Sequence, residues 1–393
     1  MTDCFATAER SLLRNTVRRF VTSDVLPHLD GWERDGELPR SLHRRAGELG
    51  LLGLSLPDAV GGGGGDAIDA LVLAEEMHYA GGSGGLFASL FTSGISLPHI
   101  VAAGDAAQID RWVRPTVSGQ LIGSLAITEP DGGSDVAGIR TRAKRDGDDW
   151  VVNGAKTYIT SGVRADFVVT AVRTGDPGAH GISLLVVEKG MPGFTVSRRL
   201  DKMGWLCSDT AELSYVDVRV PHSHLVGALD SGFIQIAQNF VSERIGLAVQ
   251  AYASAQRCLD LSVEWCRARE TFGRALISRQ TVQHTLAEMA RRVEVARVYT
   301  RSVALRASER ASSAQQANEG AQDLVLQACF AKNTAVEAGM WVVDRAVQLH
   351  GGMGYMREAE VERQYRDMRI LGIGGGTDEI LIGLAGKLLG YTG

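Results

Sequence analysis

The sequence predicts an α+β protein in which a helical segment, a β segment and a second helical segment follow one another. Apolar residues recur every three or four positions in residues 1–120 and 231–393, which is typical of amphipathic helices. Residues 121–230 contain short β-branched runs separated by turn signals. The 393 residues suffice for two or three domains that share a large core. We therefore expect three domains: helical 1–120, β 121–230 and a helical bundle 231–393.

The first domain is expected to be all helical. Its first helix, FATAERSLLRNTVRRFVTSDVLPHL, ends at Pro27 and repeats apolar residues at Leu12, Leu13, Val17, Phe20 and Val21. The segments LHRRAGELGLLGL and AIDALVLAEEMHYA repeat the pattern. The glycine run 61–65 between them lacks the lysine and serine or threonine of a P-loop, so we interpret it as a flexible connection between helices.

The middle domain is expected to be an antiparallel β domain. The segment DGDDWVVNGAKTYITSG contains two turn dipeptides, Asp146-Gly147 and Asn153-Gly154. We predict that Asn153-Gly154 joins two strands as a hairpin, because this dipeptide favours tight hairpin turns. Further strands are expected in DFVVTAV, GISLLVVEKG, FTVSRRL and TAELSYVDVRVP.

The third domain begins with a long predicted helix, FIQIAQNFVSERIGLAVQAYASAQRCLDLSVEWCRARE, of about 35 residues. Two more helices are expected in QTVQHTLAEMARRVEVARVYTRSVALRA and DLVLQACFAKNTAVEAGMWVVDRAVQLHG. Long helices with short connections predict a bundle whose apolar stripes pack internally and against other subunits.

The bulk composition argues against several classes of function. The net charge is −5 with no long block of one sign, which disfavours nucleic-acid and membrane-surface roles. The five cysteines are scattered without CxxC pairs, which suits a reducing compartment and predicts no metal site. No apolar run approaches a bilayer span, and Asp3 and Glu9 stand where a signal peptide would be hydrophobic. We expect a soluble cytoplasmic protein without a membrane span.

Two segments of the middle domain have the composition of a ligand-binding site. LAITEPDGGSDVAG follows a predicted strand and offers Thr128, two glycines, Ser134 and Asp135, whose amides and hydroxyls could donate to a phosphate or a heteroaromatic ring edge. A plain surface turn around Pro130 and Gly132 has the same composition, so both interpretations stay open. Nearby, KTYITSG places the aromatic Tyr158 beside the hydroxyl of Thr160.

Five motifs together resemble the acyl-CoA dehydrogenase family of flavoenzymes: ITEPDGGSDVAG, VNGAKTYITSG, RARETFGR, QLHGGMGY followed by VERQYRD, and GGGTDEI. The resemblance runs from about residue 5 to the end, with the motifs in family order and at family spacing. It implies an N-terminal helical domain, a middle β domain and a C-terminal four-helix bundle. It also implies FAD between the last two domains and a homotetramer built as a dimer of dimers.

The resemblance assigns two groups of residues to FAD. Around the flavin ring it implies Leu125, Ile127, Thr128, Tyr158, Ile159 and Thr160, with the Thr160 hydroxyl near N5 and with Gly133 and Ser134 near the phosphates. At a site shared with a neighbouring subunit it implies Arg269, Phe272, Gln280, Gln348 and Gly352, with Thr377 and Glu379 touching FAD from the closing loop. Singly, Arg269 could be a surface ion pair, Gln348 a polar helix end and Gly352 a helix C-cap.

The closing loop lacks the side chain that the reaction requires. Many family members carry the catalytic base as the glutamate of a Tyr-Glu-Gly-Thr segment, whereas this chain reads Gly374-Gly375-Gly376-Thr377. The isovaleryl-CoA and long-chain branches place the base on the first long helix of the C-terminal domain, just before an arginine. Here that place is occupied by Glu243 and Arg244.

Helix periodicity points to Glu243 independently. Residues three, four and seven apart share a face, so Glu243 lines up with Ile236, Phe240, Gly246 and Leu247. Arg244 points about 100° away and is no natural ion-pair partner for Glu243. An acid on an apolar stripe is costly unless it has a task or a partner, although a tolerated acid at a subunit contact would look the same.

We therefore expect FAD-dependent dehydrogenation of an acyl-CoA thioester to the trans-2-enoyl-CoA, in fatty acid metabolism. Glu243 is expected to take the α proton while the β hydride goes to flavin N5, and Ser134, Phe240, Arg244, Gly375 and Gly376 are expected to line the substrate. Electrons are expected to pass to an electron-transfer flavoprotein. Two alternatives stay open: an acyl-CoA oxidase, and a catalytically silent flavoprotein that binds partners or DNA. The silent branch carries a basic C-terminal extension, which the ending LAGKLLGYTG lacks. The acyl group of the substrate could be carried as a thioester by CoA or by an acyl carrier protein.

Overall fold

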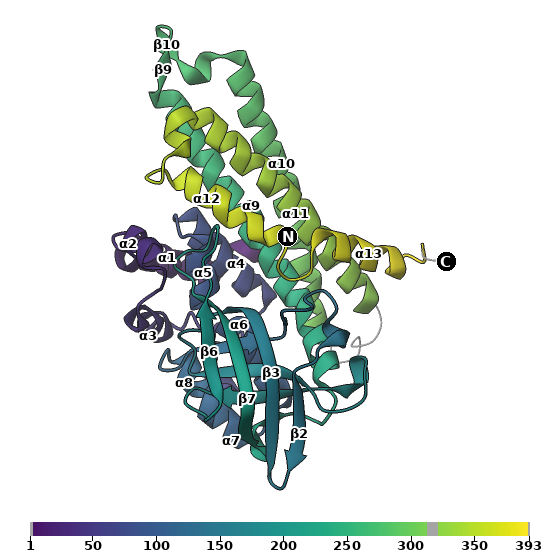
Figure 1. The fold of residues 1–393 in the computed structure, drawn as a ribbon. Coiled ribbons are helices and arrows are strands. Elements are labelled where there is room, and N and C mark those ends of the chain that lie inside the picture. Colours follow the sequence, from purple (N-terminus) through teal and green to yellow (C-terminus); the bar gives the residue numbers. More distant parts are fainter. Residues whose placement is uncertain (1–2, 313–320, 392–393) are drawn as a thin grey trace.

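The computed structural model describes residues 3–312 and 321–391. The N-terminal part is helical, as predicted; in Figure 1 its first helices lie above the β-sheet and its later helices lie beside the sheet. Its helices are α1 (Ala8–Arg19), α2 (Leu29–Asp35), α3 (Arg40–Glu48), α4 (Ala67–Tyr79), α5 (Gly84–Leu90), α6 (Ser93–Ala103), α7 (Ala106–Gln108) and α8 (Arg114–Val117). A π-helical turn, Phe20–Val25, continues α1 almost to Pro27, and the glycine run 61–65 leads into α4, which Asp66 caps. The predicted first helix and the interhelical role of the glycine run are confirmed.

The middle of the chain forms a single mixed sheet. Its strands are β1 (Gly123–Ala126), β2 (Arg142–Asp146), β3 (Asp149–Thr160), β4 (Phe167–Arg173), β5 (Ile182–Glu188), β6 (Phe194–Arg199), β7 (Thr210–Pro221) and β8 (Leu225–Val226). The order is β6-β7-β3-β2-β4-β5-β8, and β1 pairs with β4. Most pairs are antiparallel, as expected of the β domain, while β1 and β2 each meet β4 in parallel.

The predicted hairpin at Asn153-Gly154 is wrong. The turn between β2 and β3 falls at residues 146–149, where Gly147 has φ 62°. Asn153 and Gly154 lie inside β3 at a register shift against β7, and the Asn153 side chain bonds Asp217 on β7. Gly154 has φ 151° there, and a Cβ atom on it would lie 2.5 Å from Thr141 Oγ1. A bulge that passes close to other backbone favours the same residues as a tight turn, so the dipeptide alone does not separate them.

The C-terminal part is a bundle of long helices. Its elements are α9 (Gly232–Ala268), β9 (Glu270–Thr271), β10 (Arg274–Ala275), α10 (Gln280–Ser312), α11 (Ala321–His350), α12 (Glu360–Met368) and α13 (Asp378–Leu388). The 37 residues of α9 confirm the predicted long helix. In Figure 1, α9 starts beside the sheet and runs to the far end of the bundle, where the β9–β10 hairpin lies. Because α9 spans both regions, its N-terminal half can present side chains to a site between sheet and bundle.

One stretch of the described residues is long and apolar enough to cross a membrane. Residues Gly84–Ala103 have a mean hydropathy of 1.5, and half of this stretch is buried inside the protein. The prediction that no apolar run approaches the length of a bilayer span is therefore wrong. In the structure this stretch divides into α5 and α6, which pack in the protein core. Core helices of soluble proteins are commonly as long and as apolar as a membrane span. The stretch is weak evidence for a membrane span.

Candidate active site

Glu243 is a carboxylate without a protein partner. It is half-buried on α9, and it forms neither a hydrogen bond nor an ion pair with the residues that the structure describes. Burial raises the pKa of Glu243, while the positive charges of Arg244 and Lys332 oppose that rise. A carboxyl group with a raised pKa and no structural partner has the properties of a general base.

The glycine loop faces Glu243 directly. Gly375 and Gly376 have φ values of 66° and 93°, so both occupy the left-handed region that favours glycine. A Cβ atom on Gly375 would lie 2.4 Å from Leu247 Cδ1 and 3.4 Å from Glu243 Oε1. The Glu243 side chain and a side chain at residue 375 would therefore converge on the same point. The loop ends at Thr377, whose Oγ1 accepts a hydrogen bond from Ile380 N and caps α13.

Arg244 is buried beside Glu243 but does not pair with it. Its guanidinium group lies 5.1 Å from the centre of the Phe240 ring, and its Nε has no hydrogen-bond partner among the described residues. Only 6% of Arg244 is exposed, so this donor is not satisfied by bulk solvent. Unsatisfied buried donors are uncommon in folded proteins and mark places where a ligand or water completes the structure.

The ends of β1 and β3 bring the predicted flavin residues together. Thr157 N donates to Thr128 O at 3.0 Å, and Ser124 Oγ donates to Thr160 O at 2.6 Å. Tyr158 lies between these contacts with φ 60° and 70% of its surface exposed. An exposed aromatic residue held in a left-handed conformation is strained without any gain in packing, which favours a binding role. The structure thus places Leu125, Ile127, Thr128, Tyr158, Ile159 and Thr160 in one region.

The GGSD loop extends from this region into solvent. Glu129 and Gly132 form an isolated antiparallel β-bridge, and the exposed Gly133 and Ser134 follow it. Glu129 accepts hydrogen bonds from the backbone of Arg140 and Thr141, which anchors the base of the loop. The loop is therefore a surface turn anchored at its base, and the Ser134 hydroxyl at its tip has no hydrogen-bond partner among the described residues. This arrangement is compatible both with a ligand-binding loop and with a plain surface turn.

A second group of predicted residues lies far from the sheet. Arg269 follows α9, and Phe272 is at the tip of the β9–β10 hairpin, at the end of the bundle opposite the sheet (Figure 1). Phe272 is 97% exposed with φ 52°, and Arg269 forms no ion pair with any described residue. The surface ion-pair interpretation of Arg269 is therefore wrong. A single chain does not bring these residues to the flavin residues.

The other residues of this second group lie at helix ends. Gln280 begins α10, and Gln348 is exposed near the end of α11. Gly352 is not the C-cap of α11, because the left-handed residue that follows His350 is Gly351, with φ 61°. A cavity of about 220 Å³ lies in the same part of the bundle and is lined by Leu261, His350, Met353 and residues 358–361.

Two buried lysines of the site were missed by sequence reasoning. Lys332 on α11 donates to Gly376 O at 2.6 Å, and Lys156 on β3 donates to Ile127 O and to Glu129 Oε1, both at 2.9 Å. Each lysine thus holds the backbone of a segment that the motifs singled out. In the sequence, Lys332 interrupts an apolar stripe formed by Ala328, Ala331 and Ala335, and this interruption was the available signal.

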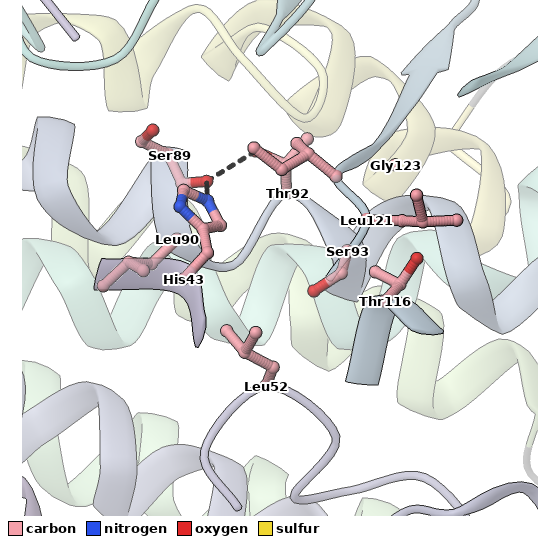
Figure 2. Close-up of a pocket in the computed structure, with 10 residues that line it drawn as sticks. His43, Leu52, Ser89, Leu90, Thr92, Ser93, Thr116, Leu121 and Gly123 are labelled. Carbon is pink, nitrogen blue, oxygen red and sulfur yellow. Dashed lines mark hydrogen bonds between the residues drawn. The ribbon is translucent and has the colours of Figure 1, made fainter. Parts of the chain in front are cut away.

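A small pocket between the N-terminal helices and the sheet is not the candidate site. Ten residues line it, among them His43, Leu52, Ser89 and Thr92, and none of the ten is a predicted site residue (Figure 2). His43 Nε2 lies 3.2 Å from Ser89 O, and burial lowers the His43 pKa to about 4, so this ring is neutral near pH 7. Among the described residues, no cluster of His, Cys, Asp or Glu side chains could hold a metal ion.

Comparison with known proteins identifies the family. Models of the N-terminal, middle and C-terminal domains of acyl-CoA dehydrogenases match residues 7–120, 124–218 and 230–389. The chain is 38% identical over 378 residues to the mitochondrial long-chain specific acyl-CoA dehydrogenase of Rattus norvegicus, covering 95% of this chain and 85% of that protein. The chain therefore belongs to the acyl-CoA dehydrogenase family, whose members are FAD-dependent oxidoreductases that act on CH–CH bonds.

Solved structures agree with this assignment. A Mycobacterium smegmatis protein provisionally described as an acyl-CoA dehydrogenase is 66% identical, with a TM-score of 0.95 and full coverage of both chains. A glutaryl-CoA dehydrogenase of the same organism, in complex with FADH2, is 27% identical, with a TM-score of 0.89 over 100% of this chain and 97% of that chain. The predicted fold class and family resemblance are confirmed.

The residues present fit FAD. The strained, exposed Tyr158 ring provides an apolar face, and the neighbouring Thr128 and Thr160 provide hydroxyl groups. Backbone amides at the N-terminus of α13, which Thr377 caps, suit an anionic group. Lys156 Nζ donates a hydrogen bond to Ile127 O and so fixes the backbone of this segment.

Proposed function

We propose that the protein dehydrogenates a saturated acyl-CoA thioester to the trans-2-enoyl-CoA, with Glu243 as the catalytic base. The observation that carries this proposal is the convergence of Glu243 Oε1 on the position that a Gly375 side chain would occupy. In this role Oε1 accepts the α proton of the thioester. FAD, when bound, supplies the acceptor for the hydride that leaves the β carbon.

The surroundings of Glu243 suit this task. Burial raises the pKa of Glu243 and makes its carboxylate a stronger base, while the positive charges of Arg244 and Lys332 oppose that rise. Phe240 and Leu247 give the site apolar walls, and Gly375 and Gly376 leave space for the acyl group next to the thioester. The presence of an unpaired carboxylate at this point favours an active enzyme over the catalytically silent flavoprotein.

We also propose that the FAD site is completed across a subunit interface in a homotetramer. Support comes from the exposed Arg269 and the exposed, strained Phe272, which lie at the end of the bundle away from their own sheet. The cavity lined by His350, Met353 and residues 358–361 offers space for part of the cofactor of a neighbouring subunit. The cytoplasmic location and the absence of a membrane span stay predictions.

An anaerobic titration tests the reaction and its electron acceptor. Acyl-CoA added without oxygen should bleach the flavin absorbance of the purified protein, and the product should be the trans-2-enoyl-CoA. We propose an electron-transfer flavoprotein as the acceptor, so admission of air should restore the colour slowly and the flavoprotein should restore it fast. Rapid reoxidation by air alone would identify an oxidase, and no bleaching with any acyl-CoA would exclude the dehydrogenation.

A further inference from the structure

Lys332 is a buried cation whose ion pair with a carboxylate is long. Its side chain is completely buried on α11 between Ala328, Ala331 and Ala335. Among the described residues, the only carboxylate oxygen within ion-pair range is Asp378 Oδ1, at 3.8 Å, which is too long for a hydrogen bond. Burial of an ammonium group with so distant a counterion is costly, so a lysine at this position requires a compensating role.

The hydrogen bond of Lys332 goes to the glycine loop. Its Nζ donates to Gly376 O at 2.6 Å, and the neighbouring Asn333 Nδ2 donates to Asp378 O at 2.9 Å. These two contacts tie the loop and the start of α13 to α11. Three consecutive glycines have little conformational preference of their own, so the loop requires such anchors to keep one position opposite Glu243.

Two cations act on Glu243: Arg244 on α9 and Lys332 on α11. The other titratable groups of this region are Cys329 on α11, Arg369 before the loop, and Asp378 and Glu379 at the start of α13. Burial raises the pKa of Glu243, and the opposing cations are Arg244 first and Lys332 second. Burial in turn lowers the Lys332 pKa, which Asp378 and Glu243 oppose. Glu243 and Lys332 therefore support each other's charged forms.

We propose that Lys332 is a positioning residue for the reaction: its ammonium group fixes the Gly374–Gly376 loop opposite Glu243 and contributes a buried positive charge to the surroundings of the Glu243 carboxylate. This proposal rests on the proposed role of Glu243 as base. Lys332 touches neither the reacting atoms nor the thioester; it acts through the loop backbone and through Glu243.

Three variants separate the two parts of this role. Lys332→Met keeps the apolar stem and removes both donor and charge, Lys332→Gln keeps a donor for Gly376 O without charge, and Lys332→Arg keeps the charge. Asn333→Ala is the matched control, because it removes the neutral anchor of the same segment. Each holoenzyme is first compared with the parent for FAD content, subunit assembly and melting temperature.

The decisive measurement is the pH profile of flavin reduction in a single turnover with a saturating acyl-CoA. Loss of the positive charge should move the acid limb of the profile to higher pH in Lys332→Met and Lys332→Gln, with about a tenfold loss of rate on the acid side. Lys332→Gln should keep the plateau rate closer to that of the parent, because its amide still holds the loop. Lys332→Arg and Asn333→Ala should keep the acid limb in place.

Infrared titration of the resting holoenzyme provides a readout that does not depend on turnover. The carbonyl band of protonated Glu243, assigned by its absence in Glu243→Gln, should appear at higher pH in the two neutral variants than in the parent. Unchanged titrations in Lys332→Met and Lys332→Gln, or an equal change in Asn333→Ala, would overturn the proposal. A Glu243→Gln enzyme with the parent's rate would instead overturn the proposed base, and the infrared result would still decide whether Lys332 acts on Glu243.

Discussion

A Cβ atom on Gly375 would lie 3.4 Å from Oε1 of Glu243. The backbone of the closing loop and the side chain from α9 therefore meet at one point, and only one of the two positions carries a carboxylate. Gly375 cannot carry a side chain without displacing Leu247, whose Cδ1 would lie 2.4 Å from that Cβ. The absence of a carboxylate from the loop and its presence on the helix are thus two aspects of one arrangement.

Substitution Glu243→Gln should reduce the rate of flavin reduction by about 10²–10⁴, because the amide keeps the shape but cannot accept the α proton. FAD content and ligand binding should survive, since neither requires the negative charge. Stopped-flow single turnover isolates this step from reoxidation. Glu264→Gln, the same change at an exposed position further along α9, is the control and should keep the parent rate. A rate in Glu243→Gln equal to that of the parent would place the base elsewhere.

Introducing Gly375→Glu into the Glu243→Gln background should restore a small part of the activity, because it returns a carboxylate to the other side of the same point. Two costs limit the rescue: φ of 66° at residue 375, which costs about 1–2 kcal/mol with a side chain present, and the contact with Leu247. Adding Leu247→Ala should increase the rescue. If the triple variant is no faster than Glu243→Gln alone, the two positions do not serve the same carbon.

Much of the fold followed from periodicity, and the errors have a local cause. The long helix α9 was predicted because its apolar stripe is unbroken over many turns. The hairpin at Asn153-Gly154 failed because a β-bulge and a tight turn favour the same dipeptide, and only the pairing of β3 with β7 distinguishes them. Lys332 escaped notice because the role of a buried lysine depends on a loop that lies 44 residues away in the chain.

The enzyme should accept acyl groups that branch next to the thioester, because the loop carries no side chain at residues 374 and 375. A Cβ atom on Gly374 would meet only Ile370 O, at 3.7 Å, so space remains there. In kcat/KM measurements, branched acyl-CoAs should therefore be used by the parent, and Gly374→Tyr should reduce their use more than that of straight chains. An equal loss for both kinds of substrate, or a parent that accepts only short straight chains, would contradict the prediction.

Substitution Arg269→Ala should weaken FAD retention and subunit assembly together, because Arg269 is exposed, unpaired within the described residues and remote from its own flavin residues. Flavin absorbance after gel filtration and the mass from light scattering measure the two effects on the same sample. Arg267→Ala removes an exposed arginine two residues earlier and serves as control. Full FAD content and an unchanged mass in Arg269→Ala would exclude the cross-subunit role.

A buried acid pair should make the stability of the protein depend on pH in an unusual direction. Asp367 on α12 accepts hydrogen bonds from Trp205 N at 2.6 Å and from Gly84 N at 3.0 Å, so it joins the bundle to the middle and N-terminal parts. Glu33 lies close by, with Ser83 Oγ donating to its Oε1 and with no partner for its Oε2 among the described residues. Burial, and then the negative charge of Glu33, raise the pKa of Asp367 to about 7.

The sign of the effect follows from proton binding. An aspartate in the unfolded chain has a pKa of about 3.9, so between about pH 4 and pH 7 the folded protein binds this proton and the unfolded chain does not. The contribution of Asp367 to stability is therefore complete below pH 4 and is lost as the pH rises through 7.

Substitution Glu33→Gln removes the neighbouring charge while both backbone hydrogen bonds to Asp367 remain. It should lower the Asp367 pKa and flatten the decline of the melting temperature across this range. Glu37→Gln, at an exposed position nearby, should leave the decline unchanged. Parallel curves of melting temperature against pH for the parent and Glu33→Gln would show that the pair is not coupled in this way.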